Sequence, residues 1–328
     1  MKNWLFGTFI AFAALALFTN IGANNTELNF PPIGNFAEIA GLRVHYHEAG
    51  SGPAIVLIHG ASTNLRDFYA SIFQPLSKKH RVIAIDRPGH GYSDRPSGDW
   101  PNPAEQAQLI RDVLRKLDVE DPLLVGHSWS GSVVLAYLLT YPQDAIGGVL
   151  LAGGSHPWEG GVAWYNDLAA LPIVGELFAW TLAYPFGLLE LDTAVRQVFF
   201  PNAVPKDYTE QTGVRLSLWP KAFLANAEDV RLLSDFLKVQ SRRYADIKHP
   251  LLLMTGDADD IVPAWNHADR LIQQAANAEI VVLENTGHAL HHTHPTRIAG
   301  FIEGFSGRLR VVARHESDSL GGQTARLQ

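Results

Sequence analysis

The middle of the chain alternates short apolar runs with longer segments of helical spacing. A run that is apolar on both sides of the backbone predicts a strand buried in a parallel sheet. The almost entirely apolar runs are residues 54–58, 81–85, 122–125, 148–151, 251–254 and 280–283. Residues 43–47 (Arg-Val-His-Tyr-His) alternate polar and apolar side chains instead, which is typical of a hairpin strand at the edge of a sheet.

Two segments between or after these runs show helical periodicity. Apolar residues share one face in 104–117, at Leu109, Ile110, Val113, Leu114 and Leu117, and in 295–305, at Ile298, Ile302 and Phe305. Strands that alternate with helices predict an α/β fold with a doubly wound, mostly parallel sheet. Active sites of such folds lie at the carboxyl ends of the strands, so the residues that follow the apolar runs are the candidates for chemistry.

The alternation is interrupted once, between residues 153 and 227. This stretch has no strand-like run and is rich in Trp, Tyr, Phe, Pro and Leu. We interpret it as a helical cap inserted over the sheet, followed by a helix over 227–244 that returns to the core. The expected core is therefore 42–152 together with 228–306, and the expected cap is 153–227.

The amino terminus carries one positive charge, at Lys2, before an apolar stretch from Trp4 to Phe18 and the small residues Gly22 and Ala23. This pattern is typical of a secretory signal peptide over 1–23. The stretch also reaches the ~20 residues that a membrane anchor needs, and a buried helix is a third interpretation. No Lys or Arg follows Lys2 before Arg43, so the positive-inside rule places the rest of the chain outside the cytoplasm.

We therefore expect a protein of the cell envelope, either membrane-anchored or periplasmic or secreted, which contacts the membrane only through its N-terminal segment. Residues 24–41 are polar and then contain Pro31 and Pro32, which suggests a tether. Residues 307–328 lack apolar periodicity past Val312 and are expected to be mostly disordered.

Composition removes several classes of function. The 328 residues are 47% hydrophobic and carry a formal net charge of -7, which excludes wholesale disorder and gives no general attraction to nucleic acid. The chain has no cysteine, so disulfides, thiol nucleophiles, thiolate zinc sites and iron–sulfur clusters are excluded. We expect a small-molecule substrate and no cofactor, and the sequence leaves the oligomeric state open.

The run at 122–125 ends in Gly126-His127-Ser128-Trp129-Ser130-Gly131, and a helix-like segment follows at once. A strand that turns into a helix without a loop leaves Ser128 at a strained apex, which requires small neighbours. A helix amino terminus at this point favours developing negative charge. The segment resembles the nucleophile elbow, G-x-S-x-G, of the α/β-hydrolase fold. It departs from the motif at Ser130, where the last glycine would stand.

Two further segments resemble the same family. His59-Gly60-Ala61 follows the run at 54–58 and is similar to the family's H-G-x loop. The resemblance implies an oxyanion hole formed by the backbone N–H groups of Ala61 and Trp129. Residues 86–93 are similar to the family's D-x-P-G-x-G-x-S turn, which we interpret as structural. Within it, His90 is expected to hydrogen-bond the loop and not to act as a base.

The resemblance also supplies an acid and a base for a serine nucleophile, which needs both. The family pattern G-x-x-D-x-x-V-P coincides with residues 256–263 and selects Asp259, while Asp257 and Asp260 are expected to be solvated or turn-capping. Gly287-His288 resembles the family's G-H loop, so His288 is the expected base. The order Ser128, Asp259, His288 is the one described for this fold.

His291, His292 and His294 are candidate ligands of a metal ion, because imidazoles at this spacing can bind one. Adjacent histidines point to different sides of any regular element, and the chain has no H-E-x-x-H pattern. We therefore expect no metal here and interpret the three histidines as surface or helix-cap polarity.

Together these residues predict a serine hydrolase that cleaves a carboxylic ester or related acyl substrate through an acyl-enzyme on Ser128. Haloalkane dehalogenases and epoxide hydrolases of this family resemble G-H-D-W, with an aspartate nucleophile, and a serine in its place would leave an inert ether. The remaining alternatives are acyl transfer or perhydrolysis, carbon–carbon bond hydrolysis, and a non-catalytic binding protein of the same fold. Nothing in the sequence identifies the substrate.

Overall fold

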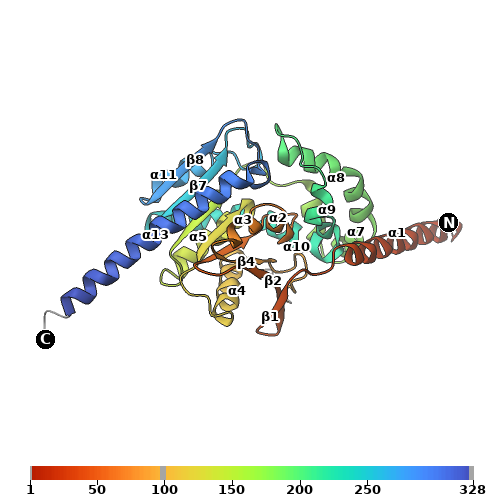
Figure 1. The fold of residues 1–328 in the computed structure, drawn as a ribbon. Coiled ribbons are helices and arrows are strands. Elements are labelled where there is room, and N and C mark those ends of the chain that lie inside the picture. Colours follow the sequence, from red (N-terminus) through yellow and green to blue (C-terminus); the bar gives the residue numbers. More distant parts are fainter. Residues whose placement is uncertain (1, 97–100, 325–328) are drawn as a thin grey trace.

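The computed structural model describes residues 2–96 and 101–324, with side chains over 6–96 and 101–311. One 8-stranded sheet has the order β1-β2-β4-β3-β5-β6-β7-β8 (Figure 1). The strands are β1 (Asn35–Ile39), β2 (Leu42–Ala49), β3 (Ala54–Ile58), β4 (Arg81–Ile85), β5 (Leu123–His127), β6 (Gly147–Leu151), β7 (Leu251–Gly256) and β8 (Ala278–Leu283). From β4 to β8 all neighbours are parallel, which confirms the predicted mostly parallel sheet.

The apolar runs became strands because their residues face helices on both sides of the sheet. Every residue of β3, β5, β6 and β7 is buried. The alternating segment forms β2, but β2 is not the edge strand, because β1 pairs with it in antiparallel register. In β1 only Ala37 is buried, so this strand has no apolar run that the sequence could reveal.

Helices cover both faces of the sheet (Figure 1). They are α2 (Arg66–Tyr69), α3 (Phe73–Ser77), α4 (Pro103–Lys116), α5 (Gly131–Thr140), α11 (Ala268–Gln274), α12 (Leu290–Thr293) and α13 (Pro295–Thr324). One apolar cluster joins the sheet to α4 and α5, and a second joins it to α3 and α13. The helix predicted over 104–117 begins one residue earlier, because Asn102 and Glu105 form a reciprocal capping box at its start.

The predicted helical insertion lies between β6 and β7 (Figure 1). It contains α6 (Trp164–Ala169), α7 (Val174–Phe178), the π-helical turn η2 (Ala179–Ala183), α8 (Tyr184–Phe199), α9 (Tyr208–Thr212), η3 (Val214–Leu218) and α10 (Pro220–Gln240). The helix that returns to the core begins at Pro220, earlier than the expected 227, so a single helix runs from the insertion to η4 (Ser241–Asp246) and the core.

Both ends of the chain are more ordered than we expected. Helix α1 (Lys2–Asn29) continues through the first part of the predicted tether, and β1 occupies the last part, because Thr26 is buried against the insertion and Ala37 against the sheet. Helix α13 continues into the segment predicted to be disordered, where Leu309 packs on the core. The remainder of that tail, residues 325–328, lies outside the described residues, as does Met1.

Helix α1 is long and apolar enough, over Phe6–Asn29, to cross a membrane by length and composition, and few of its side chains are buried. A signal sequence passes the same test. No second helix in the described part of the chain meets it.

Candidate active site

Ser128 occupies the turn between β5 and α5, where a short 3₁₀ segment, η1 (Ser128–Ser130), takes the place of a loop. Its φ of 53° lies in the left-handed region, which is strained for a residue with a side chain. A Cβ at Gly126 would lie 2.4 Å from the Ser130 carbonyl oxygen, and one at Gly131 would lie 2.7 Å from Gly153 Cα. The turn therefore closes only with glycine at these two positions.

The loop after β3 packs directly against this turn. A Cβ at Gly60 would lie 2.9 Å from the Cβ of Ser128, and the Ser130 hydroxyl donates a hydrogen bond of 2.5 Å to the His59 carbonyl oxygen. The two loops that carry the backbone N–H groups of Ala61 and Trp129 thus meet at Ser128. This is the arrangement that an oxyanion hole between the two loops requires.

His288 and Asp259 form a buried pair. His288 Nδ1 lies 2.8 Å from Asp259 Oδ2, and the other carboxylate oxygen accepts hydrogen bonds of 2.9 Å from the backbone N–H groups of Ile261 and Val262. Burial by itself raises the pKa of Asp259, but His288 and these two N–H groups outweigh it and hold the pKa below its usual range. Asp259 is therefore suited to remain a carboxylate that orients the imidazole ring.

Neither of the two competing carboxylates is hydrogen-bonded to His288. Asp257 is exposed, and its Oδ1 accepts a hydrogen bond of 3.2 Å from the backbone N–H of Thr286. Asp260 is exposed as well. The structure thus brings Asp259, of the three, into hydrogen-bond contact with His288.

The turn of Ser128 and the His288–Asp259 pair are neighbours through His127. The ring of His127 lies 4.9 Å from the ring of His288, measured between centroids, and its Nε2 is 3.3 Å from the His288 carbonyl oxygen. Among the described residues no hydrogen bond joins the Ser128 hydroxyl to His288. Hydrogen bonds between a nucleophile and its base are often long until the substrate binds.

A cavity of about 320 Å³ opens beside the acid–base pair. It is lined by the loops that follow β7 and β8 and by the end of α8. The lining residues are Ala258, Asp259, Asp260 and Ile261 after β7, His288 after β8, and Thr193, Arg196, Gln197 and Phe200 at the end of α8. Its volume suits a small organic molecule.

The insertion closes over these loops through backbone contacts. Asn202, which follows α8, donates to the Asn285 carbonyl oxygen (2.8 Å) and accepts from the Gly287 N–H (3.0 Å). On the other side of the site, the Asn226 side chain of α10 accepts a hydrogen bond of 2.6 Å from the Ser62 N–H. The insertion therefore contacts both the loop that carries His288 and the loop that carries Ala61, an expected oxyanion donor.

Arg87 is fully buried against the loop after β3, and no sequence pattern marks it as a residue of the site. Its guanidinium donates to the carbonyl oxygens of His59 (3.1 Å) and Gly60 (3.0 Å), and it lies 4.2 Å from the centroid of the Trp129 ring. Asp229, on α10, lies 2.5 Å from the same guanidinium. A single buried cation thus contacts both loops that meet at Ser128.

Asp229 links this cation to the insertion. Its side chain also binds Arg95 at 2.8 Å, and its backbone carbonyl oxygen accepts a hydrogen bond of 2.9 Å from the Trp129 indole. His90 is buried here too, with its Nδ1 3.1 Å from the Pro88 carbonyl oxygen, which is the loop contact that we expected. The only sequence signal for Asp229 was a carboxylate on a helix that otherwise packs against the core.

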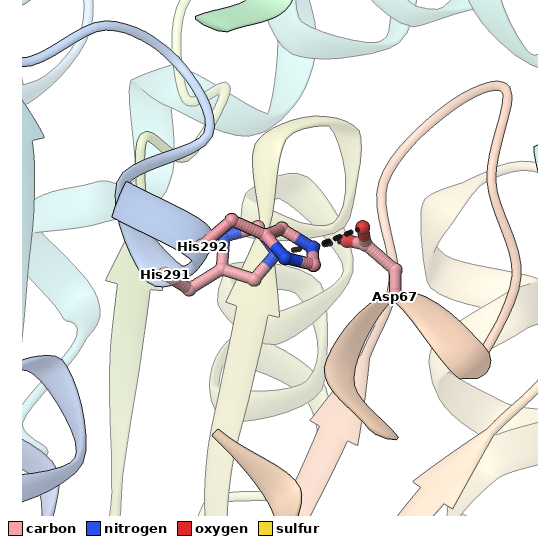
Figure 2. A group of neighbouring side chains, drawn as sticks. All are labelled: Asp67, His291 and His292. Atoms are coloured by element: carbon pink, nitrogen blue, oxygen red, sulfur yellow. Dashed lines mark hydrogen bonds and ion pairs between the residues drawn. The ribbon is translucent and has the colours of Figure 1, made fainter. Parts of the chain in front are cut away.

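A second buried cluster lies next to the site (Figure 2). Both His291 and His292 point toward Asp67 of α2, with Nε2 atoms 2.8 Å from Oδ2 and 2.7 Å from Oδ1, respectively. Our expectation that the two rings would diverge as surface polarity was wrong, because the single turn of α12 lets both reach one carboxylate. His294 does not join them, since its Nε2 contacts the Thr286 hydroxyl at 2.9 Å.

Asp67, His291 and His292 are the residues that could hold a metal ion, since each offers one ligand atom and these atoms lie within 4.8 Å of one another. A metal-bound histidine normally donates its second ring N–H to an acceptor, but His291 Nδ1 has no partner among the described residues. Burial raises the pKa of Asp67, yet the two imidazoles lower it well below its ordinary value. These contacts account for the cluster as a hydrogen-bonded tie between α2 and α12.

The model of the alpha/beta hydrolase family matches residues 55–301. An uncharacterized protein of Mycobacterium tuberculosis is 29% identical over 84% of this chain and 81% of its own length. A 2-hydroxy-6-oxononadienedioate/2-hydroxy-6-oxononatrienedioate hydrolase of Paraburkholderia phymatum is 27% identical over 81% of this chain and 92% of its own.

Solved structures give the same similarity. The structure of an N-acyl homoserine lactone degrading enzyme superposes with a TM-score of 0.64 and 25% sequence identity. The match covers 83% of this chain and all of that chain. The similarity therefore extends over the sheet and the insertion together.

Removing the charge of Asp229 should destabilise the fold strongly. In Asp229→Asn the Arg87 cation stays buried without its counter-ion, so we expect the free energy of unfolding to fall by about 3–5 kcal/mol. Urea denaturation followed by circular dichroism measures this change. Asp235→Asn, which removes an exposed carboxylate from the same helix, is the matched control and should leave the midpoint unchanged. Equal midpoints for both variants would contradict the assigned role of the pair.

Stability should fall as the pH drops from about 7 toward 4. His267 Nδ1 accepts hydrogen bonds from the backbone N–H groups of Ser155 (3.1 Å) and His156 (3.2 Å), and burial lowers the pKa of His267 to about 4. In the unfolded chain this ring takes up a proton near pH 6.5, so protons favour unfolding between the two values.

His267→Asn keeps an acceptor at this position and removes the titration. The free energy of unfolding of this variant, measured with urea at several pH values, should depend less on pH between 7 and 4 than that of the wild type. The control Gln273→Asn changes an exposed side chain of α11 that does not titrate, and it should keep the wild-type slope. A wild-type slope in His267→Asn would show that this ring does not set the pH dependence.

Proposed function

Because the chain belongs to the alpha/beta hydrolase family, we propose that it is a serine hydrolase that cleaves a carboxylic ester or related acyl substrate. The observation that carries the proposal is the buried His288–Asp259 pair at 2.8 Å, beside the strained turn that presents Ser128. A weak nucleophile, a base that can activate it and a carboxylate that orients the base make up the residue set for acyl transfer.

The proposed reaction begins with attack of the Ser128 hydroxyl oxygen on the carbonyl carbon of the substrate. His288 takes the hydroxyl proton on Nε2, while Asp259 holds Nδ1–H and stabilises the imidazolium. The N–H groups of Ala61 and Trp129 bind the oxygen that becomes negatively charged. The imidazolium then protonates the leaving alcohol, and water activated by His288 cleaves the acyl-enzyme and restores Ser128.

A second candidate is hydrolysis of a carbon–carbon bond by the same residues. The similarity to a hydrolase named for 2-hydroxy-6-oxononadienedioate favours it, since that substrate is an oxo-dienedioate and not an ester. A panel of p-nitrophenyl esters of increasing chain length, thioesters and a vinylogous diketone would distinguish the two. Turnover of esters or thioesters supports the first function, and turnover of the diketone alone supports the second.

We also propose that the hydrolase acts outside the cytoplasm. Helix α1 is apolar over Phe6–Asn29, and the one basic residue near this stretch, Lys2, precedes it. The positive-inside rule then leaves the amino terminus in the cytoplasm and the catalytic domain on the other side of the membrane.

Ser128→Ala should abolish catalysis and leave the fold intact. The variant lacks the nucleophile, so we expect kcat to fall by about 10³-fold or more and covalent labelling by a fluorophosphonate probe to disappear. Ser77→Ala, at the end of α3, is the matched control and should label as the wild type does. A folded wild-type protein that takes up no probe would favour the non-catalytic binding protein.

The choice among the carboxylates has its own test. Asp259→Asn should lower kcat by several orders of magnitude, about 10⁴-fold, because the amide no longer holds the required imidazole tautomer. Asp257→Asn removes an exposed carboxylate two residues away and should retain near-normal turnover of a p-nitrophenyl ester. If Asp257→Asn proved the more damaging substitution, Asp259 would not be the acid of the site.

A further inference from the structure

The first half of the insertion exposes an unusual number of large apolar side chains. Between residues 164 and 189 the only charged residues are Asp167 and Glu176, and neither Lys nor Arg occurs. We define the cap apolar surface as the exposed residues Trp164, Leu171, Ile173, Val174, Leu177, Trp180, Phe186 and Leu189. The side chains of Ile173 and Leu189 are 82% and 76% exposed. Exposed apolar surface on this scale marks an interaction site.

Helix α1 packs against the same part of the insertion, where it contacts η2, η3 and α8 (Figure 1). The ring of Phe18 lies 6.2 Å from the ring of Tyr184, and Thr19 is fully buried. A Cβ at Gly22 would lie 2.3 Å from the Tyr184 ring, so only glycine fits there. The Ala23 carbonyl oxygen accepts a hydrogen bond of 3.1 Å from the Trp219 indole. Residues 18–23 are thus fitted to the insertion, which favours their retention over cleavage as a signal peptide.

The free part of α1 is too short to cross a bilayer alone. From Lys2 to Leu17, before these contacts, the helix measures about 24 Å at 1.5 Å per residue. The hydrocarbon core of a bilayer is about 30 Å thick. If α1 spans it, the part of the insertion around Tyr184 must lie within the membrane boundary. The apolar side chains exposed beside it are suited to that depth.

We propose that α1 is retained as a membrane anchor and that the cap apolar surface inserts into the leaflet on the catalytic side of the same bilayer. The occupant of this surface is lipid. Trp164 and Trp180 are exposed on this surface, and tryptophan is enriched at the membrane–water interface. Residues 164–189 contain no Lys or Arg. The cap apolar surface is therefore attracted to the membrane by burial of its apolar side chains, about 5–10 Å deep, and not by anionic headgroups. The proposal rests on α1 as an anchor and does not depend on the chemistry of Ser128.

The chain has no cysteine, so one introduced thiol can report the depth of one position. We would label Ile173→Cys and, separately, Leu177→Cys with an environment-sensitive nitrobenzoxadiazole dye in the full-length protein. The protein is reconstituted in vesicles of phosphatidylethanolamine and phosphatidylglycerol that carry doxyl-labelled lipid. Val282→Cys is the matched control, since Val282 is an exposed apolar residue (49%) of β8, and β8 lies on the opposite side of the molecule from α1 (Figure 1).

The expected result is a blue-shifted emission and several-fold stronger quenching by doxyl lipid at positions 173 and 177 than at 282. Equal, water-like spectra at all three positions would overturn the proposal. So would dye shielding that rises with protein concentration without doxyl quenching, because a second copy would then cover the surface. Recovery of a mature chain that lacks residues 1–23 by mass spectrometry would also overturn it. Fluorophosphonate labelling of the same samples tests Ser128 independently of membrane depth. A failure of this proposal can therefore be told from a failure of the proposed function.

Discussion

The loops of the site are arranged around one constraint, the strained turn that carries Ser128. A left-handed backbone at a serine is costly, and it persists only where neighbouring groups leave no alternative. Here Gly126 and Gly131 let the backbone close, and Gly60 lets the loop after β3 approach within contact of Ser128. The strain therefore depends on three positions where a single methyl group would push two segments apart.

The buried Arg87–Asp229 pair connects this turn to the insertion. A buried ion pair rarely adds net stability over apolar packing, so its value lies in the geometry that it specifies. Arg87 binds the carbonyl oxygens of two residues in the loop after β3, while Asp229 fixes the Trp129 indole through its own backbone. A displacement of α10 would reach both loops at once, which makes the insertion part of the site and not merely a cover.

The sheet was predictable from the sequence, and much of the geometry around the site was not. A strand buried on both faces has an apolar run, so β3 to β7 were visible. β8 was visible from its apolar run at 280–283, although only Leu283 in it is buried, whereas β1 buries only Ala37 and left no pattern. Asp259 was separable from its neighbours only through a family motif. The sequence does not reveal Arg87, Asp229 and Asp67. Each is a charged side chain whose partner is far away in sequence, and the periodicity of a sequence does not show such pairs.

The two sides of the insertion have opposite requirements, and one stretch of chain satisfies both. Its inner side must be polar at fixed points, since Asn202 and Asn226 hydrogen-bond the backbone of the site loops. Its outer side, over residues 164–189, is apolar and meets α1. Helix α10 is continuous from the insertion to η4 and carries Asp229. Packing that fixes the outer side of the insertion therefore also helps to fix Asp229. The position of the insertion and the packing of the loops at Ser128 thus depend on the same helices.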